Sequence, residues 1–320
     1  MATRGGDVIE LDVLTAGEAL VLLAAESPGA LEAIDRFRRF SAGAELNVAV
    51  GLARLGLRVG YMSRVGDDAF GRFLRAAMTR EGLSCDLVAL DPARSTGFML
   101  KSLAGGGDPT VDYYRRGSAA SAMDATDLAR VASTQARHVH LTGILPALSA
   151  GCRELAFALA TTARGRGQRV SFDPNLRARL WGSHAEMVTT VNALAAQSDL
   201  VLPGLAEGRL LTGRHDAEDV AEFYLHLGAS EVVVKLGAEG AFCSDRSGLR
   251  AHVPGFAAER VVDTVGAGDG FAVGVVSGLL DGLPLQAAVR RGNAIGARVV
   301  QFPGDSDGLP TREELDGLVF

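Results

Sequence analysis

From about residue 125 onwards, runs of β-branched and apolar residues alternate with longer amphipathic stretches, and this alternation limits the possible folds more than any other feature of the chain. Strands separated by helices of about 10–15 residues form a parallel sheet with helices on both faces. Ligands bind such sheets beyond the carboxyl ends of the strands, so a site is expected where the chain leaves them. The predicted strands span residues 138–143, 168–175, 198–204, 230–237 and 240–245, and the predicted helices span about 150–165, 184–196, 205–212 and 217–227.

The same rhythm occurs near the start of the chain. Residues 44–56 carry apolar side chains at helical spacing, residues 58–66 predict a buried strand, and residues 67–82 predict an amphipathic helix. We expect these units to belong to the main α/β domain, which then comprises about residues 42–85 and 117–320.

Two other segments, about residues 12–41 and 86–116, consist of short extended runs broken by glycine. The glycine-rich stretch 104–109 separates two such runs and predicts a hairpin. Extended pieces interleaved with β–α units suggest a small β-sheet lid that projects from the main domain and is discontinuous in sequence. The edges of such a sheet invite pairing with a second copy, so a homo-oligomer through the lid is one expectation.

Charge and cysteine content argue against several classes of protein. The chain carries a net charge of −6, which disfavours nucleic acid or an anionic membrane as a partner. Its three cysteines form no CxxC pair, so neither a disulfide framework nor a zinc site is expected. An apolar run at 19–25 follows acidic rather than basic residues and is too short to span a membrane. We therefore expect a cytoplasmic protein.

The stretch "VVDTVGAGDGFAVG" (261–274) leads into an apolar helix and indicates a phosphate site. A P-loop needs a lysine after its glycines, and this chain has Asp269 instead. A dinucleotide-binding turn needs a glycine at position 271, where this chain has Phe271. The spacing therefore excludes a P-loop and disfavours an NAD-dependent oxidoreductase.

The remaining interpretation is a hollow of backbone N–H groups at the start of a helix. Small residues from Gly266 to Gly268 let a phosphate approach, and the helix dipole favours its charge. A carboxylate at Asp269 would repel a resting anion, but it can accept a proton from a hydroxyl that attacks phosphorus. The motif therefore predicts a small-molecule kinase with Asp269 as general base. A simpler interpretation, an aspartate that caps a glycine-rich turn, stays open on the motif alone.

Two segments resemble the signatures of the ribokinase-like (PfkB) carbohydrate kinases, and the resemblance extends over essentially the whole chain. "DTVGAGDGFAVG" resembles the C-terminal signature, and "AGAELNVAVGLARLGLRVGYMSRVGDDAFG" (42–71) resembles the N-terminal one. Within the family the chain is most similar to 2-keto-3-deoxygluconate kinases. That similarity rests on "TAGEALVLL" (15–23), "YYRRGSAAS" (113–121), "VHLTGILPALS" (139–149), "FDPNLRARLW" (172–181) and "VVVKLGAEGAF" (232–242).

The resemblance implies a three-layer α/β/α domain with a mostly parallel sheet that holds ATP, and a β-sheet lid that closes over the sugar. It also implies transfer of the ATP γ-phosphate to a primary hydroxyl, with Asp269 as the base. The anion hole would consist of the amides of Gly266, Ala267 and Gly268.

The resemblance further implies binding roles for residues spread along the chain. Gly43 and Asn47 match positions that bind sugar hydroxyls, and Tyr113, Arg115 and Arg177 match positions that hold an acid sugar. The positions that match nucleotide contacts are Lys235, Gly237, Ala238, Gly240 and Asn293, besides Gly266 and Gly268. Glu207 matches a residue that organises Mg²⁺ through water. Asp263 is a candidate ligand of a monovalent cation such as K⁺, or a cap of the turn.

The chain departs from the family pattern at two positions. The first signature usually reads Gly-Gly, and here it reads Ala42-Gly43. The magnesium-organising motif usually starts with asparagine, and here it starts with Gly204, three residues before Glu207. Metal placement is therefore expected to depend on Glu207, water and the ATP phosphates.

A carboxylate substrate needs fixed positive charge, preferably from arginine, because the guanidinium group binds a carboxylate in a bidentate manner. Arg115 at the end of a lid strand and Arg177 at a strand exit would face each other across a closing lid, and Tyr113 would share the face of Arg115. Each arginine could instead be an ordinary surface charge. We expect an ATP- and Mg²⁺-dependent kinase of 2-keto-3-deoxygluconate that forms the 6-phosphate. The alternatives are a kinase of a neutral ketose, of ribose or a nucleoside, or of another sugar acid, and a non-catalytic sugar-binding regulator.

Overall fold

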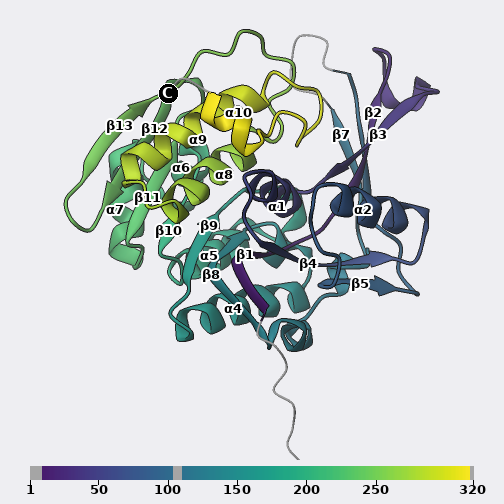
Figure 1. Cartoon of the computed structure of the whole chain (residues 1–320), viewed down its shortest axis with the longest axis horizontal. Helices are drawn as coiled ribbons and strands as arrows, with labels where there is room; N and C mark the ends of the chain where they lie inside the picture. Colours follow the sequence, from purple (N-terminus) through teal and green to yellow (C-terminus); the bar gives the residue numbers. More distant parts are fainter. Residues whose placement is uncertain (1–8, 104–109, 318–320) are drawn as a thin grey trace, which may run out of the picture.

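The computed structural model describes residues 9–103 and 110–317. Its centre is a nine-stranded sheet with the order β13-β12-β11-β10-β9-β8-β1-β4-β5 (Figure 1). Neighbouring strands from β11 to β5 are parallel, and β12 and β13 add an antiparallel edge. The strands are β1 (Ile9–Ala16), β4 (Val59–Gly66), β5 (Val88–Asp91), β8 (Thr134–Thr142), β9 (Arg169–Asp173), β10 (Leu200–Val201), β11 (Glu231–Lys235), β12 (Gly240–Asp245) and β13 (Arg250–Pro254).

Helices cover both faces of this sheet, which explains why its strands are apolar on both sides. The three valines at 232–234 in β11, for example, are fully buried. One core lies under α1 (Ala44–Arg54), α2 (Ala69–Arg80), α8 (Ala267–Leu280), α9 (Leu285–Val299) and α10 (Arg312–Gly317). The other lies under α4 (Ala150–Gly165), α5 (His184–Ala195), α6 (Leu205–Thr212) and α7 (Ala217–Leu227), and the short α3 (Leu145–Leu148) precedes α4.

Close packing of α8 on α9 fixes the helix that follows the glycine-rich motif. A Cβ atom at Gly274 would lie 2.5 Å from the Cα atom of Gly292, so the two helices can approach this closely only because both positions lack a side chain. The buried face of α8 also packs on α1, where a Cβ atom at Gly51 would lie 2.5 Å from Val273. The first turn of α8 is therefore held rigidly beside α1.

A second, four-stranded sheet forms the lid, with the order β3-β2-β6-β7. Its strands are β2 (Leu20–Ala25), β3 (Phe37–Ala42), β6 (Phe98–Lys101) and β7 (Val111–Tyr114). β2 pairs with β3 in antiparallel and with β6 in parallel fashion, and β6 and β7 form the expected antiparallel pair. The lid stands to one side of the large sheet (Figure 1). The predicted turn at 104–109 lies outside the described residues.

The lid is smaller than its predicted ranges of 12–41 and 86–116. Residues 12–16 belong to β1, which lies between β8 and β4 in the large sheet, and β5 pairs with β4 rather than with a lid strand. The prediction was wrong there because a short extended run has the same pattern in either sheet, and only its partner strands decide where it belongs. Within the described part of the chain, no helix combines the length and the apolarity needed to cross a membrane.

Candidate active site

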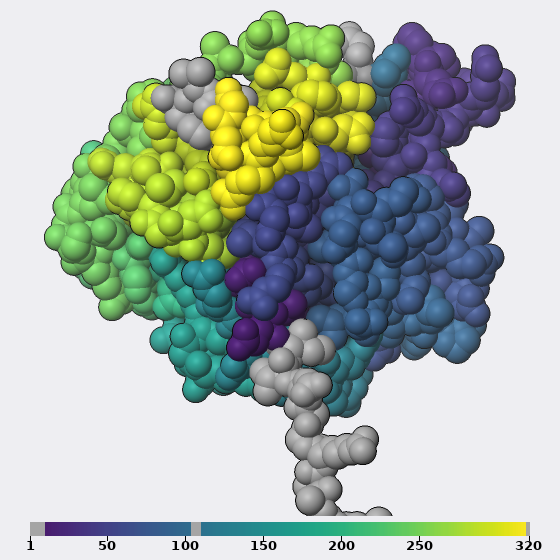
Figure 2. All heavy atoms as spheres, in the orientation of Figure 1, coloured from purple at the N-terminus to yellow at the C-terminus, as the bar shows by residue number. Residues whose placement is uncertain are grey.

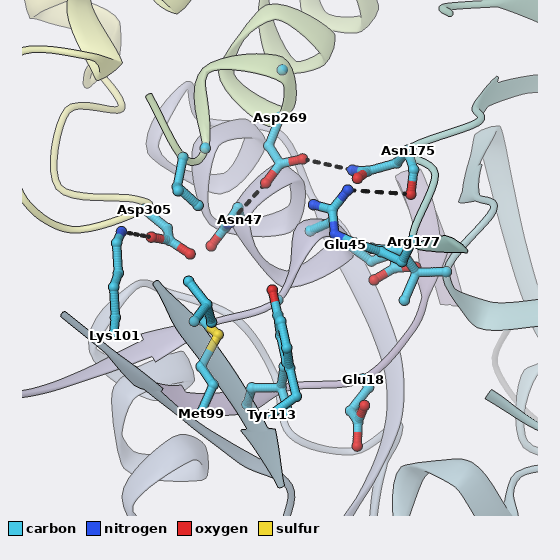
Figure 3. Close-up of a pocket in the computed structure, with 18 of the residues that line it drawn as sticks. Glu18, Glu45, Asn47, Met99, Lys101, Tyr113, Asn175, Arg177, Asp269 and Asp305 are labelled. Carbon is cyan, nitrogen blue, oxygen red and sulfur yellow. Dashed lines mark hydrogen bonds and ion pairs between the residues drawn. The ribbon is translucent and has the colours of Figure 1, made fainter. Parts of the chain in front are cut away.

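A pocket lies between the lid and the carboxyl ends of the large-sheet strands (Figure 3). Parallel strands place their exit loops at one edge of the sheet, so residues far apart in sequence converge there. Side chains of the lid that line it include Leu20, Met99, Lys101, Val111 and Tyr113. The body contributes, among others, Gly43, Asn47, Asn175, Arg177, Glu207, Lys235, Gly266, Gly268, Asp269 and Asp305.

The first turn of α8 forms a hollow of backbone amides at this pocket. Gly266 precedes the helix with φ of +85°, a conformation that side chains rarely adopt, and a Cβ atom there would lie 2.3 Å from the carbonyl oxygen of Asp305. Ala267 begins the helix. A Cβ atom at Gly268 would meet only Lys235 Nζ, at 3.7 Å. The helix start is thus open toward the pocket and can hold an anion such as phosphate.

Asp269 lies in the same turn, and two amide side chains orient its carboxylate. Asn47 on α1 donates to Oδ2 over 2.8 Å, and Asn175 donates to Oδ1 over 3.2 Å (Figure 3). Burial raises the pKa of Asp269 to about 7; the Asn47 hydrogen bond opposes this shift, and the negative charge of Asp173 adds to it. A carboxylate with this pKa is a suitable general base near neutral pH.

Asn175 lies in the segment "FDPNLRARLW" (172–181), and the sequence did not predict it as a site residue. Its φ of +38° makes it the only non-glycine residue with positive φ in the described chain. Asp173 Oδ1 accepts the N–H of Asn175 over 3.1 Å, a turn that asparagine tolerates better than most residues. The available signal was the Asp-Pro-Asn turn directly after a buried strand, and the turn delivers an amide to the base.

Lys235, at the end of β11, lies beside the hollow. Its ammonium group pairs with Asp173 over 2.6 Å and is largely buried. Burial disfavours the ammonium form, but the charges of Asp173 and Glu207 outweigh it and raise the pKa of Lys235. The lysine therefore stays charged at physiological pH and can attract phosphate oxygens.

The two predicted substrate arginines differ in environment. Arg115 is buried and forms an ion pair with Glu18, with 2.5 Å between Nη2 and Oε2. Arg177 is exposed, donates only to the carbonyl oxygens of Asn175 and Leu176, and forms no ion pair with a carboxylate of the described residues. Its positive charge nevertheless acts on Asp269 and opposes the rise in the pKa of that carboxyl. Tyr113, 44% exposed, projects from the lid into the pocket (Figure 3).

Glu207 ties two loops together. Its Oε2 atom accepts the N–H of Gly204 over 2.7 Å, and its Oε1 atom accepts the N–H of Leu176 over 2.7 Å. Among the described residues no group of three or more His, Cys, Asp or Glu side chains could hold a metal ion. Glu207 itself lines the pocket, and a single carboxylate is compatible with Mg²⁺, which commonly takes only one or two protein carboxylates and keeps several water ligands.

The model of the pfkB family of carbohydrate kinases matches residues 11–312. The chain belongs to this family. The kinase is 48% identical to the 2-dehydro-3-deoxygluconokinase of Bacillus subtilis (strain 168), over 96% of this chain and 95% of that protein. Among solved structures it resembles a PfkB protein from Polaromonas sp. JS666, with a TM-score of 0.88 and 51% identity over 96% of this chain and 100% of that one. The family resemblance and the ribokinase-like fold predicted from the sequence are confirmed.

A more distant solved relative adds a sugar complex. A double mutant of fructokinase from Vibrio cholerae O395, in a form bound to fructose, ADP and potassium ion, has a TM-score of 0.84 and 28% identity, over 98% of this chain and 99% of that one. The PfkB kinase described here thus shares its fold with enzymes named for neutral and for acid sugars.

Gly43 lies in the pocket as its motif suggests. Its φ of +130° and its contact with the segment between β1 and β2 require glycine, because a Cβ atom would lie 2.4 Å from the carbonyl oxygen of Glu18. Ala42, which replaces the usual first glycine of the signature, is fully buried in β3.

Four predicted nucleotide residues do not line the pocket. Asn293 on α9 is buried and donates to the carbonyl oxygens of Val253 and Pro254, each over 3.0 Å. Position 240 requires glycine, because its φ is +103° and a Cβ atom would lie 2.1 Å from the carbonyl oxygen of Val253. Gly237 and Ala238 form the short turn before β12. These residues shape the β11–β12 corner, and a nucleotide role for them stays a prediction.

Asp263 does not provide an open cation site. Its carboxylate pairs with the ammonium group of Lys101, which also contacts Asp305 over 3.3 Å. The expectation of a K⁺ ligand at Asp263 therefore does not fit this structure, because a lysine already takes that position. Nothing in the sequence indicated that a lid residue would reach this aspartate.

Proposed function

We propose that this PfkB kinase transfers the γ-phosphate of ATP to the terminal hydroxyl of 2-dehydro-3-deoxygluconate, also called 2-keto-3-deoxygluconate, and forms the 6-phosphate. One observation carries the proposal: Arg177, which is exposed and forms no ion pair with a described carboxylate, lies in the same pocket as Asp269. The pocket thus combines a general base with a cation suited to a substrate carboxylate. The 48% identity to a 2-dehydro-3-deoxygluconokinase supports the same substrate.

In the proposed reaction the substrate hydroxyl gives its proton to Asp269 as its oxygen bonds to the γ-phosphorus. The bond between that phosphorus and the oxygen bridging to the β-phosphate breaks, and ADP leaves. Amides of Gly266–Gly268 donate to the transferring phosphoryl group, and Lys235 offsets its charge from the side. Asn47 and Asn175 hold the base in position.

Bound Mg²⁺ would neutralise charge on the ATP phosphates. Glu207 is the pocket carboxylate suited to hold it through water, because both of its oxygens accept only backbone N–H groups and keep free lone pairs. The lid would cover the reactants and exclude water, which otherwise competes as acceptor of the phosphoryl group.

The test is the ratio of kcat/KM values for 2-dehydro-3-deoxygluconate, fructose and ribose in the wild-type kinase and in Arg177→Ala. We expect the sugar acid to be the preferred substrate. At about pH 8.5, where Asp269 is deprotonated with or without the charge of Arg177, the variant should lose ~10²-fold or more for the sugar acid but less than about fivefold for a neutral sugar, because only the substrate carboxylate then loses a charge partner. Arg179→Ala, an exposed arginine two residues further on, is the matched control and should change neither ratio. An equal loss for every sugar would contradict a carboxylate-binding role.

Arg115 supports the substrate assignment only indirectly, because Glu18 balances its charge. A neutral ketose is therefore the second candidate, in keeping with the fructokinase among the solved relatives. A preference for fructose in the same assay, unaffected by Arg177→Ala, would establish this second candidate.

A further inference from the structure

Lys101 is a lid residue that reaches into the body of the enzyme. It ends strand β6, and its ammonium group contacts the carboxylates of Asp263 and Asp305, which lie 162 and 204 residues further along the chain. All three side chains are buried, with exposures of 8% or less. In Figure 3 the lysine rises from the lid strand toward Asp305.

The two aspartates belong to the segments that shape the anion hole. Asp263 Oδ1 accepts the N–H of Val265 over 3.0 Å, just before Gly266. The carbonyl group of Asp305 packs directly on Gly266. Figure 2 shows the C-terminal segment, in yellow, lying against the lid strands, in purple. The Lys101 ammonium group thus connects the lid to both aspartates that contact the anion-hole segment.

The Lys101 ammonium group balances the negative charge of the two buried carboxylates. Without it, two carboxylates would be buried close together behind a hollow that must accept the phosphoryl group of ATP. Unpaired buried charges are costly, and like charges placed next to each other oppose both each other and an incoming phosphate. A compact cation between the carboxylates removes both problems.

The identity of the residue supports a requirement for a compact cation. Of the 32 lysines and arginines in the chain, only Lys101 and Lys235 are lysines. Both line the pocket, and both pair with aspartates. A chain that uses arginine at its other cationic positions keeps lysine where a point charge has to fit between buried carboxylates, because the planar guanidinium group is larger and directional.

We propose that the Lys101 ammonium group is a built-in monovalent cation of the anion hole, so that this kinase works without added K⁺. The inference rests on the proposed kinase function. The anion hole would then depend on the lid, because Lys101 is the last residue of the lid strand β6. A free ion of similar size could take its place only if the side chain were shortened.

The experiment measures turnover in buffers whose only cation besides Mg²⁺ is tetramethylammonium, which is too large for the space between the two carboxylates. The same measurement is repeated after adding about 100 mM K⁺, NH₄⁺ or Na⁺. We expect wild-type kcat to change less than about twofold on adding K⁺. Lys101→Ala should lose ~10- to 100-fold without K⁺, as expected for losing a charged group that stabilises the transferring phosphate, and should recover several-fold with K⁺ or NH₄⁺.

Two further variants keep the test decisive. Lys101→Met fills the same space without charge, so it should lose activity but show no recovery with K⁺. Arg116→Met removes an exposed cation just after the lid strand β7 and should behave as wild type. Activation of the wild type by K⁺, or equal loss and no recovery in both Lys101 variants that keep wild-type circular dichroism, would overturn the proposal.

The proposed substrate and the proposed cation can fail separately. The cation dependence is measured with whichever sugar gives the highest wild-type kcat/KM. If the proposed substrate is incorrect, the ranking of the sugars changes, but the response of turnover to K⁺ can still be measured.

Discussion

At the scale of the residue, Asp269 connects structure to a measurable pH profile. Burial, opposed by the Asn47 hydrogen bond, places the pKa of Asp269 at about 7 in the free enzyme. A general base acts only when deprotonated, so kcat/KM should fall about tenfold per pH unit below pH 7 and level off above it. The measurement is kcat/KM for the sugar between pH 5 and 9 at saturating ATP. A flat profile down to pH 5 would contradict the assignment of Asp269 as base.

Replacing the same residue separates catalysis from binding. Asp269→Asn keeps the size of the side chain but removes the proton acceptor, so kcat should drop ~10²- to 10⁴-fold. The dissociation constant of an ATP analogue, measured by calorimetry, should change little, because the amides at 266–268 are intact. Turnover near the wild-type value would rule out proton transfer to Asp269.

Residues also differ in how far the sequence predicts them. Asp269 and Gly266 follow from one contiguous motif, since a phosphate hollow and its base lie within a single helical turn. The partnership of Lys101 with Asp263 could not be predicted, because it depends on how the lid docks on the body. Arg115 lines the pocket, but its pairing with Glu18, 97 residues away, is a tertiary contact that no local pattern encodes.

At the scale of the element, the start of α8 needs two glycines for different reasons. Gly266 adopts positive φ against Asp305, whereas Gly268 is helical and faces open space beside Lys235. Gly266→Ala should therefore lower both the melting temperature and kcat, because strain of about 1–3 kcal/mol must be relieved by moving the helix start or the loop.

Gly268→Ala is the matched change within the same element. Alanine favours a helix over glycine by about 1 kcal/mol, so the melting temperature should stay the same or rise. The methyl group would project into the hollow, so KM for ATP should rise or kcat should fall. Thermal melts and steady-state kinetics of both variants test this difference. If Gly268→Ala lost as much stability as Gly266→Ala, the two glycines would not have distinct roles.

The helices and many strands of the large domain were predictable from local patterns, but the sheet to which a short strand belongs was not. A helix such as α5, predicted at 184–196 and found at His184–Ala195, has its own apolar period and a capping serine. Strand β1, in contrast, was assigned to the lid. Its position between β4 and β8 is decided by pairing with segments about 45 and 125 residues away, which a local pattern does not report.

At the scale of the whole molecule, the pocket carries a cost in stability that depends on pH. The folded-state pKa of Asp269, about 7, lies above its ordinary value of 3.8, so folding favours the protonated form. The stabilising contribution of this group is therefore complete below about pH 4 and is lost as pH rises toward 7. The buried His138 and His140 act in the opposite direction, because burial lowers their pKa values, that of His140 to about 3, and their contribution is lost as pH falls below about 6.5.

Comparison of the Asp269→Asn variant with the wild type separates the pH-dependent stability due to Asp269 from that due to the two histidines. The stability of Asp269→Asn relative to wild type, measured without ligands by denaturant unfolding, should increase from pH 4 to about 7 and then stay constant, by up to roughly 4 kcal/mol. The histidines and the exposed groups are the same in both proteins and cancel from the difference. A difference that does not vary with pH would mean that Asp269 ionises freely in the folded state. It would then take no stability from the molecule, and the raised pKa that suits it to act as a base near neutrality would have no physical origin in burial.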